Sequence, residues 1–174
     1  MHALQESRKL GGRTVLEQFV KGREFSIAVL EGQALPAIEI IPKAGFYASN
    51  IPGQAIAVDS ISLYGIGAHG DVELLNTSRN VSSLVMPFRN DADTTQFVIR
   101  YDMNVLAQMN MRDTLTFVYT RYPYFISPQC GVTFNYKIEQ LSCTHHLLDS
   151  ATLVVDEVTN KDQETLRLYY YVSQ

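Results

Sequence analysis

The strongest constraint on the fold is a period-two alternation in two segments of the chain. In residues 114–120, large hydrophobic side chains occupy alternate positions: Leu115, Phe117 and Tyr119. Residues 166–172 repeat the pattern at four positions: Leu166, Leu168, Tyr170 and Val172. Successive side chains of a β-strand point to opposite faces, so this pattern is typical of strands with one buried face. The two segments therefore predict β-structure rather than helix.

Six further short hydrophobic runs are separated by turn residues. They occupy residues 55–64, 72–75, 82–86, 95–101, 131–138 and 151–155. The first run changes face near Asp59 and Ser60, which indicates a bend, and the polar stretches 90–93 and 160–162 favour turns. Together with the alternating segments, these runs predict a mainly β fold, an antiparallel β-sandwich of about eight strands over residues 55–174.

One stretch, residues 102–112, fits a strand poorly because its hydrophobic residues do not alternate. We expect Met103, Met109 and Met111 to line a loop or a helical turn there.

The N-terminal residues 1–43 predict a separate segment. Residues 3–10 favour a short helix that ends at Gly11 and Gly12. Three hydrophobic runs follow at residues 14–20, 24–30 and 35–41, and glycine-containing turns separate them. We therefore expect a short helix and a three-stranded meander, joined to the sandwich by a junction at residues 44–54 that contains Pro52 and Gly53.

The charge distribution also changes near Lys43. Residues 1–43 carry six basic and five acidic side chains, and the remaining eight basic and thirteen acidic side chains give the body a net charge of −5. This change indicates two segments of different origin, although counts this small also arise by chance. The overall charge of −4 offers no basic surface for a phosphate backbone, so no nucleic-acid partner is expected. No hydrophobic run approaches the roughly 20 residues of a transmembrane helix.

Two strings in the N-terminal segment resemble the D-alanine–D-alanine ligase family of ATP-grasp enzymes. They are VLEQFVKGREFS at residues 15–26 and ALPAIEIIPK at residues 34–43, within a resemblance that covers residues 3–47. The resemblance implies that Glu17 and Val20 correspond to positions that flank the adenine of ATP, and that Glu24 corresponds to a ribose contact.

The resemblance ends before the catalytic half of such a ligase. Residues 48–50 replace the loop that carries the family's tyrosine and lysine. No later metal-binding segment and no N-terminal substrate domain of that family is recognised. Phosphoryl transfer depends on bound Mg²⁺ and on cations around the transferred phosphate. We therefore expect no enzymatic activity and no cofactor, and interpret Glu17, Val20 and Glu24 as vestigial nucleotide contacts.

The larger segment, residues 45–172, resembles a family of small envelope lipoproteins of Bacteroidota with no assigned function. The strings that carry the resemblance are AGFY (44–47), DSISLYGIG (59–67), LVMPF (84–88), DTTQFV (93–98), DTLTFVY (113–119) and ISPQCG (126–131). It implies a location in the cell envelope, in the periplasm or at the outer membrane.

Members of that lipoprotein family begin with a signal peptide and an acylated cysteine, whereas residues 2–12 here are mostly polar. The location would be cytoplasmic if Met1 is the true start. We interpret the chain as either a true fusion or an artefactual, chimeric reading frame, which sequencing across the codons for residues 35–55 would distinguish.

The cysteines and histidines of the C-terminal half are the first candidates for a metal site. Cys130, Cys143, His145 and His146 are residue types that bind zinc. However, the chain has no Cys-x-x-Cys pair, and adjacent side chains of a strand point to opposite faces. We therefore predict no metal site and two free thiols, with a Cys130–Cys143 disulfide as the alternative in an oxidising compartment.

No other motif predicts catalysis. The string GIGAHG at residues 65–70 matches the dinucleotide fingerprint G-x-G-x-x-G, but no helix is predicted after it, so a turn is expected. Asp followed by Ser or Thr, at Asp59, Asp93, Asp113 and Asp149, resembles the O-glycosylation motif of exported Bacteroidota proteins. A turn residue before a strand explains the same pattern and is the interpretation we favour.

The sequence thus predicts a non-enzymatic, envelope-associated β-sandwich that binds a partner or has a structural role. An envelope protein is the expected partner, and Tyr169 and Tyr171 are a candidate contact surface because the last strand is aromatic on both faces. The alternatives are a catalytically incomplete ligase remnant and a carbohydrate-binding module. The sequence predicts neither the ligand nor the oligomeric state.

Overall fold

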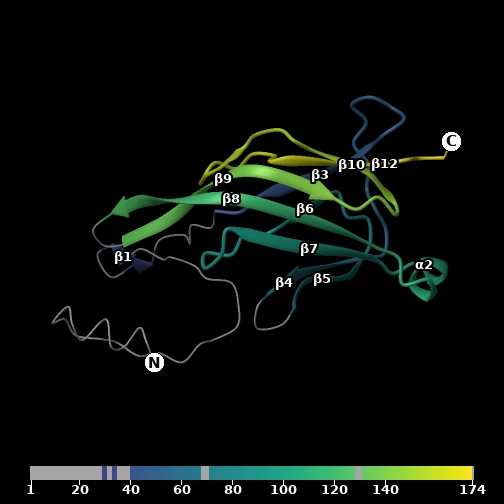
Figure 1. The fold of residues 1–174 in the computed structure, drawn as a ribbon, viewed down its shortest axis with the longest axis horizontal. Helices are drawn as coiled ribbons and strands as arrows, with labels where there is room; N and C mark the ends of the chain where they lie inside the picture. The colour runs from purple at the N-terminus through teal and green to yellow at the C-terminus, as the bar shows by residue number, and fades with distance from the viewer. Residues whose placement is uncertain (1–28, 31–32, 35–39, 68–70, 128–130, 174) are drawn as a thin grey trace.

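Two facing β-sheets form the body of the protein (Figure 1). The computed structural model describes residues 29–30, 33–34, 40–67, 71–127 and 131–173. The six-stranded sheet contains β4 (Ile61–Ile66), β5 (Val72–Ser78), β7 (Thr94–Tyr101), β8 (Arg112–Ser127), β9 (Gly131–Cys143) and β11 (Glu157–Val158), in the order β11-β9-β8-β7-β4-β5. The four-stranded sheet contains β3 (Lys43–Ala48), β6 (Ser83–Val85), β10 (Leu148–Leu153) and β12 (Leu166–Tyr170), in the order β10-β12-β3-β6. The predicted mainly β fold is confirmed.

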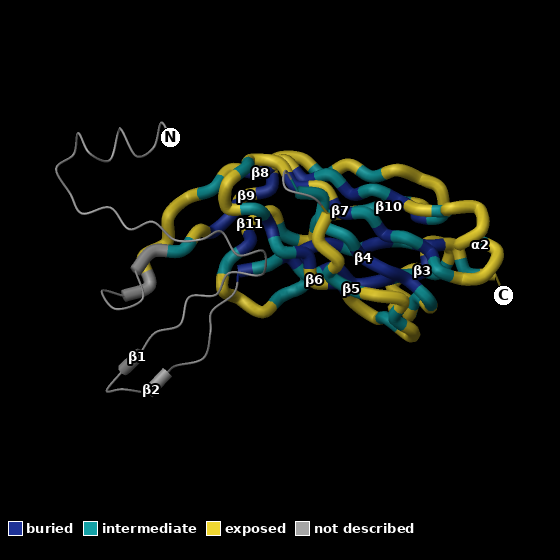
Figure 2. Tube along the Cα trace, turned by 90° about the horizontal axis from the view of Figure 1, so that it is seen from below, coloured by how far each residue is buried: buried dark blue, intermediate teal, exposed yellow. Residues whose placement is uncertain are grey.

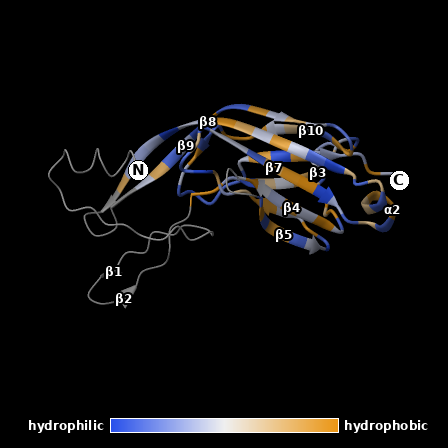
Figure 3. Ribbon diagram, turned by 60° about the horizontal axis from the view of Figure 1, so that its bottom comes forward, coloured by the Kyte–Doolittle hydropathy of each residue, from blue (hydrophilic) through white to orange (hydrophobic). Residues whose placement is uncertain are grey.

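Each of the eight predicted strands has a counterpart in these sheets, and the predicted alternation is present. Leu115, Phe117 and Tyr119 are buried along β8, and Leu166, Leu168 and Tyr170 are buried along β12. Figure 3 shows hydrophobic and hydrophilic residues alternating along the strands, and Figure 2 shows the buried residues in the middle of the sandwich. The bend expected near Asp59 is also present, since Ser60 has a φ of 52° immediately before β4.

The four-stranded sheet contains a strand that the sequence did not predict. β3 lies within the residues expected to form an irregular junction, yet Ala44, Phe46 and Ala48 are buried along its inner face. The sandwich therefore extends N-terminally of residue 55. Gly45 faces the opposite way, and the Glu164 carboxylate and the Tyr47 ring occupy the space that a Cβ at Gly45 would need. The division of the chain near Lys43 stays a prediction.

One strand pair departs from the expected antiparallel arrangement. β3 pairs with β12 in parallel, with Phe46 opposite Leu168, whereas the other strand pairs described are antiparallel. Parallel neighbours cannot be joined by a tight hairpin. Along the chain, β3 is the first strand of the sandwich and β12 is the last. No short connection therefore fixes their relative direction.

Aromatic rings fill much of the space between the sheets. Phe88 stacks on Tyr119 with a centroid separation of 4.3 Å and makes an edge contact with Tyr136 at 5.4 Å. At the opposite end of the sandwich, Tyr101 of β7 meets Tyr170 of β12 at 6.3 Å. Four tyrosines are therefore core residues, in keeping with the size of the aromatic side chains that a sandwich must bury: Tyr101, Tyr119, Tyr136 and Tyr170.

The remaining connections agree with the sequence. Residues 102–112 contain the short helix α2 (Asn104–Gln108), which confirms the helical turn. β4 and β5 are antiparallel neighbours with Gly65 opposite Val72, so the G-x-G-x-x-G string joins two strands and does not open a helix. Within the ranges that the structure describes, no helix is long and apolar enough to cross a membrane.

Little of the N-terminal segment lies within the described residues. β1 (Val29–Leu30), at the end of the second predicted run, pairs antiparallel with β2 (Gln33–Ala34), which precedes the third run. The predicted helix at residues 3–10 and the vestigial contacts Glu17, Val20 and Glu24 lie outside the described residues, so these predictions are untested.

Candidate functional site

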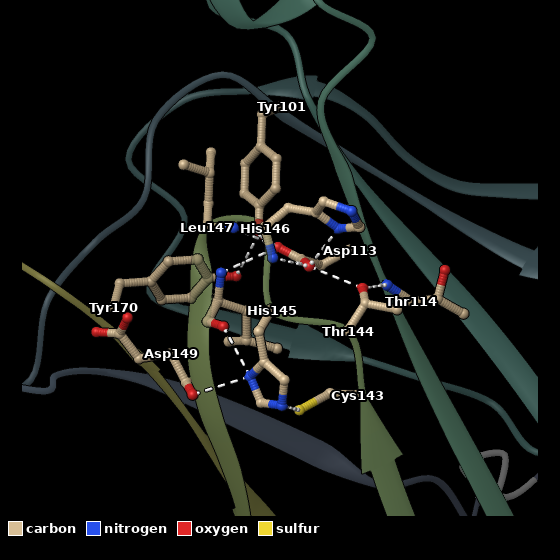
Figure 4. Close-up of polar contacts among 11 residues, drawn as sticks. Tyr101, Asp113, Thr114, Cys143, Thr144, His145, His146, Leu147, Asp149 and Tyr170 are labelled. Carbon is tan, nitrogen blue, oxygen red and sulfur yellow. Dashed lines mark hydrogen bonds and ion pairs between the residues drawn. The ribbon is translucent and has the colours of Figure 1, made fainter.

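A fully buried carboxylate, that of Asp113, lies at the centre of a polar cluster between the two sheets (Figure 4). Its Oδ1 accepts hydrogen bonds from the Thr144 hydroxyl at 2.7 Å and from the backbone N–H of His146 at 2.8 Å. Its Oδ2 accepts hydrogen bonds from the Tyr101 hydroxyl and from the backbone N–H groups of Leu147 and Leu148, each at 2.9 Å. Both oxygens of this buried charge are therefore satisfied, as a buried carboxylate requires.

The partners of Asp113 come from both sheets and from the chain that joins them. Asp113 lies at the start of β8, and the backbone donors follow β9 and lead into β10 of the other sheet. Tyr101 of β7 extends the cluster through its hydroxyl, 3.1 Å from that of Tyr170 on β12. The cluster therefore fastens the six-stranded sheet to the four-stranded sheet at one end of the sandwich.

The hydrogen bonds to Asp113 favour the ionised form of its carboxyl group. Burial by itself raises the pKa of a carboxyl group, but the N–H groups of residues 146–148 and the Thr144 hydroxyl favour the ionised form and lower the pKa to about 2. Burial also raises the pKa of Tyr101 and of Tyr170, which keeps both hydroxyls protonated as donors. Asp113 is thus an anion at neutral pH, and its contacts show a structural role.

The alternation of β8 contained a signal for this site. Asp113 occupies the same face as Leu115 and Phe117, so a charged residue falls on the buried side of the strand. A charge at such a position requires partners from elsewhere in the fold. The sequence could not name them because Tyr101 and the backbone of residues 146–148 approach only after the sheets pack.

The structure separates the neighbouring histidines, as the alternation of an extended chain predicts. The Nδ1 atom of His146 lies 3.2 Å from Asp113 Oδ1. His145 is directed to the other side, where its Nε2 atom lies 3.9 Å from the Sγ atom of Cys143. Burial raises the pKa of the Cys143 thiol, which is the opposite of the shift that activates a nucleophilic cysteine.

The alternative disulfide is incompatible with this geometry. Cys143 has a free thiol and is the last residue of β9, whereas Cys130 lies outside the described residues, bonded to Gly131 at the start of the same strand. A strand of 13 residues spans about 40 Å, whereas the Cα atoms of a disulfide lie within about 7 Å. In the described part of the chain, no group of three or more potential metal ligands occurs.

The aspartates of the four Asp-Ser or Asp-Thr motifs make contacts that organise turns and strand ends. Asp59 accepts a hydrogen bond from the backbone N–H of Asn80 at 2.6 Å, and Asp93 accepts one from Arg121 at 3.1 Å. Asp149 bonds to Ser49 across the small sheet, and Asp113 is the buried centre described above. The turn interpretation therefore fits Asp59 and Asp93, which precede β4 and β7, whereas Asp113 and Asp149 lie within β8 and β10. Glycosylation stays untested.

Exposed aromatic side chains gather at the far end of β8 and β9, which we call the β8–β9 arm (residues 120–127 and 131–135). The pairing of β8 with β7 ends at Val118, and that of β9 with β11 ends at Tyr136. Figure 1 shows both strands extending past their neighbours. Four aromatic side chains of the arm are at least 37% exposed: Tyr122, Tyr124, Phe125 and Phe134.

A buried acceptor lies beside these rings. Asn135 is opposite Tyr122 and only 7% exposed. Among the buried side-chain polar atoms of the described residues, only its Oδ1 has no hydrogen-bond partner. The surface predicted at the last strand is less exposed, because Tyr169 packs beside Tyr47 at 5.9 Å, although Tyr171 is exposed. The sequence reasoning missed the arm because its hydrophobic residues resemble an ordinary strand.

Comparisons with known proteins find one family model and short matches to one class of enzyme. The model of a family of unknown function, DUF6452, matches residues 60–170, from β4 through β12. D-alanine–D-alanine ligase of Actinobacillus pleuropneumoniae serotype 5b is 44% identical over 45 residues, which cover 26% of this chain and 15% of that enzyme. The corresponding enzyme of Aquifex aeolicus is 51% identical over 35 residues, or 20% of this chain and 12% of the enzyme.

The ligase matches are therefore short, since the chain spans only about a seventh of the length of these enzymes. No solved structure matches the chain.

Proposed function

On the premise that this chain belongs to DUF6452, a family of unknown function, we propose that it is a non-enzymatic binding module. The contact surface that we propose is the β8–β9 arm. One observation carries the proposal: the large exposed aromatic side chains of the sandwich concentrate on a hairpin that projects beyond its neighbouring strands.

Both faces of the arm carry such side chains. Tyr122 and Tyr124 are two residues apart and lie on one face, whereas Phe125 lies on the other. Leaving large aromatic side chains in water forgoes the stabilisation that burial would provide, and aromatic residues are enriched in protein interfaces.

The proposed lack of enzymatic activity is supported by the hydrogen bonds of Asp113 and by the pKa of the Cys143 thiol. Asp113 directs both oxygens at protein donors, and the Cys143 thiol has a raised pKa, so neither is prepared for acid–base or nucleophilic chemistry. The proposed location in the cell envelope rests on the lipoprotein-like strings of residues 45–172. Fractionation of the native host with an antibody to the sandwich would test that location.

Quantitative pull-down from an envelope extract tests the contact surface. The bait is the full chain, compared with Tyr122→Ser and Phe125→Ser on the arm and with Tyr171→Ser as a matched control. Tyr171 is 70% exposed but lies after β12, outside the arm. We expect the arm variants to lose a protein that both the wild type and the control retain. If all four baits retain the same proteins, the arm is not the contact surface.

A ligase remnant is the second candidate function, and the short matches to D-alanine–D-alanine ligases favour it. Isothermal titration of the full chain with ATP and Mg²⁺ distinguishes the two. Absence of heat at millimolar nucleotide would remove the remnant as a nucleotide binder and leave the binding-module proposal intact. Titration with soluble glycans tests the carbohydrate alternative, for which the neighbouring rings of Tyr122 and Tyr124 are the candidate platform.

A further inference from the structure

Cys143 and His145 form a pair of soft-metal ligands that the proposed binding function does not use. The two residues are separated by one position, and the Cys143 Sγ atom lies 3.9 Å from the His145 Nε2 atom (Figure 4). Metal–sulfur and metal–nitrogen bonds are about 2.3 and 2.0 Å long. An ion between the two atoms would therefore bind both at a wide, bent angle without movement of the backbone.

The backbone fixes the imidazole in the form that a metal requires. The Nδ1 atom of His145 lies 3.2 Å from the carbonyl oxygen of Leu148 and 3.0 Å from that of Asp149. Carbonyl oxygens only accept hydrogen bonds, so Nδ1 carries the proton and the lone pair of Nε2 faces the thiol. Metal-binding histidines are held in this way, with the second ring nitrogen donating to a carbonyl or carboxylate.

The number and charge of the ligands select the kind of ion. The described residues offer no third histidine, cysteine or carboxylate at this position, and His146 is directed to Asp113. Zinc sites normally have four ligands, whereas thiolate and imidazole with fewer ligands suit Cu(I). A thiolate, a neutral imidazole and a monovalent cation also sum to zero charge, which suits a half-buried sulfur.

We propose that Cys143 and His145 bind one Cu(I) ion. The ion replaces the proton of the Cys143 thiol, which passes to solvent, and a sulfur–copper bond and a nitrogen–copper bond form. No electron is transferred, so copper must arrive as Cu(I). The surrounding β9–β10 connection remains anchored on Asp113 and does not change partners.

Anaerobic titration with Cu(I) against a chromogenic Cu(I) chelator tests the site. The full chain with Cys130→Ser serves as the parent, so that the other thiol cannot contribute. We expect one equivalent of Cu(I) to bind. We expect affinity to fall at least about 100-fold in Cys143→Ser and about 10- to 100-fold in His145→Ala. His146→Ala is the matched control, because it removes an exposed imidazole one residue away, and it should bind as the parent does.

The proposal is overturned if the parent binds no Cu(I) in competition with the chelator, or if His145→Ala and His146→Ala bind equally well. Copper-edge X-ray absorption of the loaded parent gives a readout that needs no variant to fold. The expected spectrum has one sulfur and one nitrogen neighbour at about 2 Å, and a spectrum without sulfur would contradict the site. Zinc should not compete at equal concentration, and a zinc complex of similar affinity would also refute it.

Discussion

Replacement of Asp113 by asparagine is the most direct test of how the two sheets are joined. The change preserves shape but leaves one acceptor oxygen, while the new NH₂ group faces backbone donors such as those of Leu147 and Leu148. A buried N–H left without an acceptor costs about 1–3 kcal/mol. Removing one partner of a buried charged network costs about 3–5 kcal/mol. We therefore expect Asp113→Asn to lose about 3–5 kcal/mol of unfolding free energy at pH 7.

The same carboxylate predicts a pH dependence with a defined sign. Its pKa is about 2 in the folded protein, against an ordinary value of 3.8. Because the folded value is the lower one, the ionised group stabilises the fold fully above about pH 4, and this stabilisation is lost as the pH falls towards 2. The difference corresponds to about 2.5 kcal/mol, and it should be absent from Asp113→Asn.

Urea unfolding followed by tyrosine fluorescence and circular dichroism, at pH 7 and at intervals down to pH 2.5, measures both quantities. Asp162→Asn is the control, since the Asp162 side chain is 82% exposed and should change stability by less than about 0.5 kcal/mol. If Asp113→Asn does not fold, Thr144→Val removes a single donor to Asp113 and should cost about 1 kcal/mol. A cost below 1 kcal/mol for Asp113→Asn, or an unchanged acid dependence, would refute the reasoning.

Four further substitutions probe other parts of the fold, each by thermal or urea unfolding. Phe88→Ala should cost about 3–5 kcal/mol because it removes a buried ring stacked on Tyr119, and a cost near zero would show that this end of the core is not close-packed. Gly45→Ala should cost about 1–2 kcal/mol by displacing the Glu164 carboxylate. Adding Glu164→Ala to Gly45→Ala should remove only part of that penalty, because the Tyr47 ring also lies 2.9 Å from a Cβ at Gly45. A penalty that Glu164→Ala leaves unchanged would show that the Glu164 carboxylate is not its source. Phe125→Ser on the arm should change stability by less than about 0.5 kcal/mol, so a large loss would mean that the arm is packed in solution.

The pattern of hydrophobic residues in the sequence was sufficient to predict most of the strands. Leu115, Phe117 and Tyr119 face the core because the period of a strand is two, and this holds whatever partner the strand meets. β3 was not recognised because it is short and lies close to Pro52 and Gly53, which predict an irregular stretch. Its strand conformation is stabilised by Leu166 and Leu168 of β12, which lie far away along the chain.

The sequence by itself therefore determined the fold class, eight of the strands, and the inward face of the two strands that alternate most clearly, β8 and β12. It also placed a charge, Asp113, on one of those inward faces. Only the tertiary structure decided that β3 and β12 are parallel and that the β8–β9 arm extends beyond its neighbours. It also decided that the Asp113 carboxylate accepts hydrogen bonds from donors of both sheets. The physical reason is that periodicity is a local property of the chain. Strand pairing, hydrogen-bond partners and exposure depend instead on segments that meet only when the sheets pack.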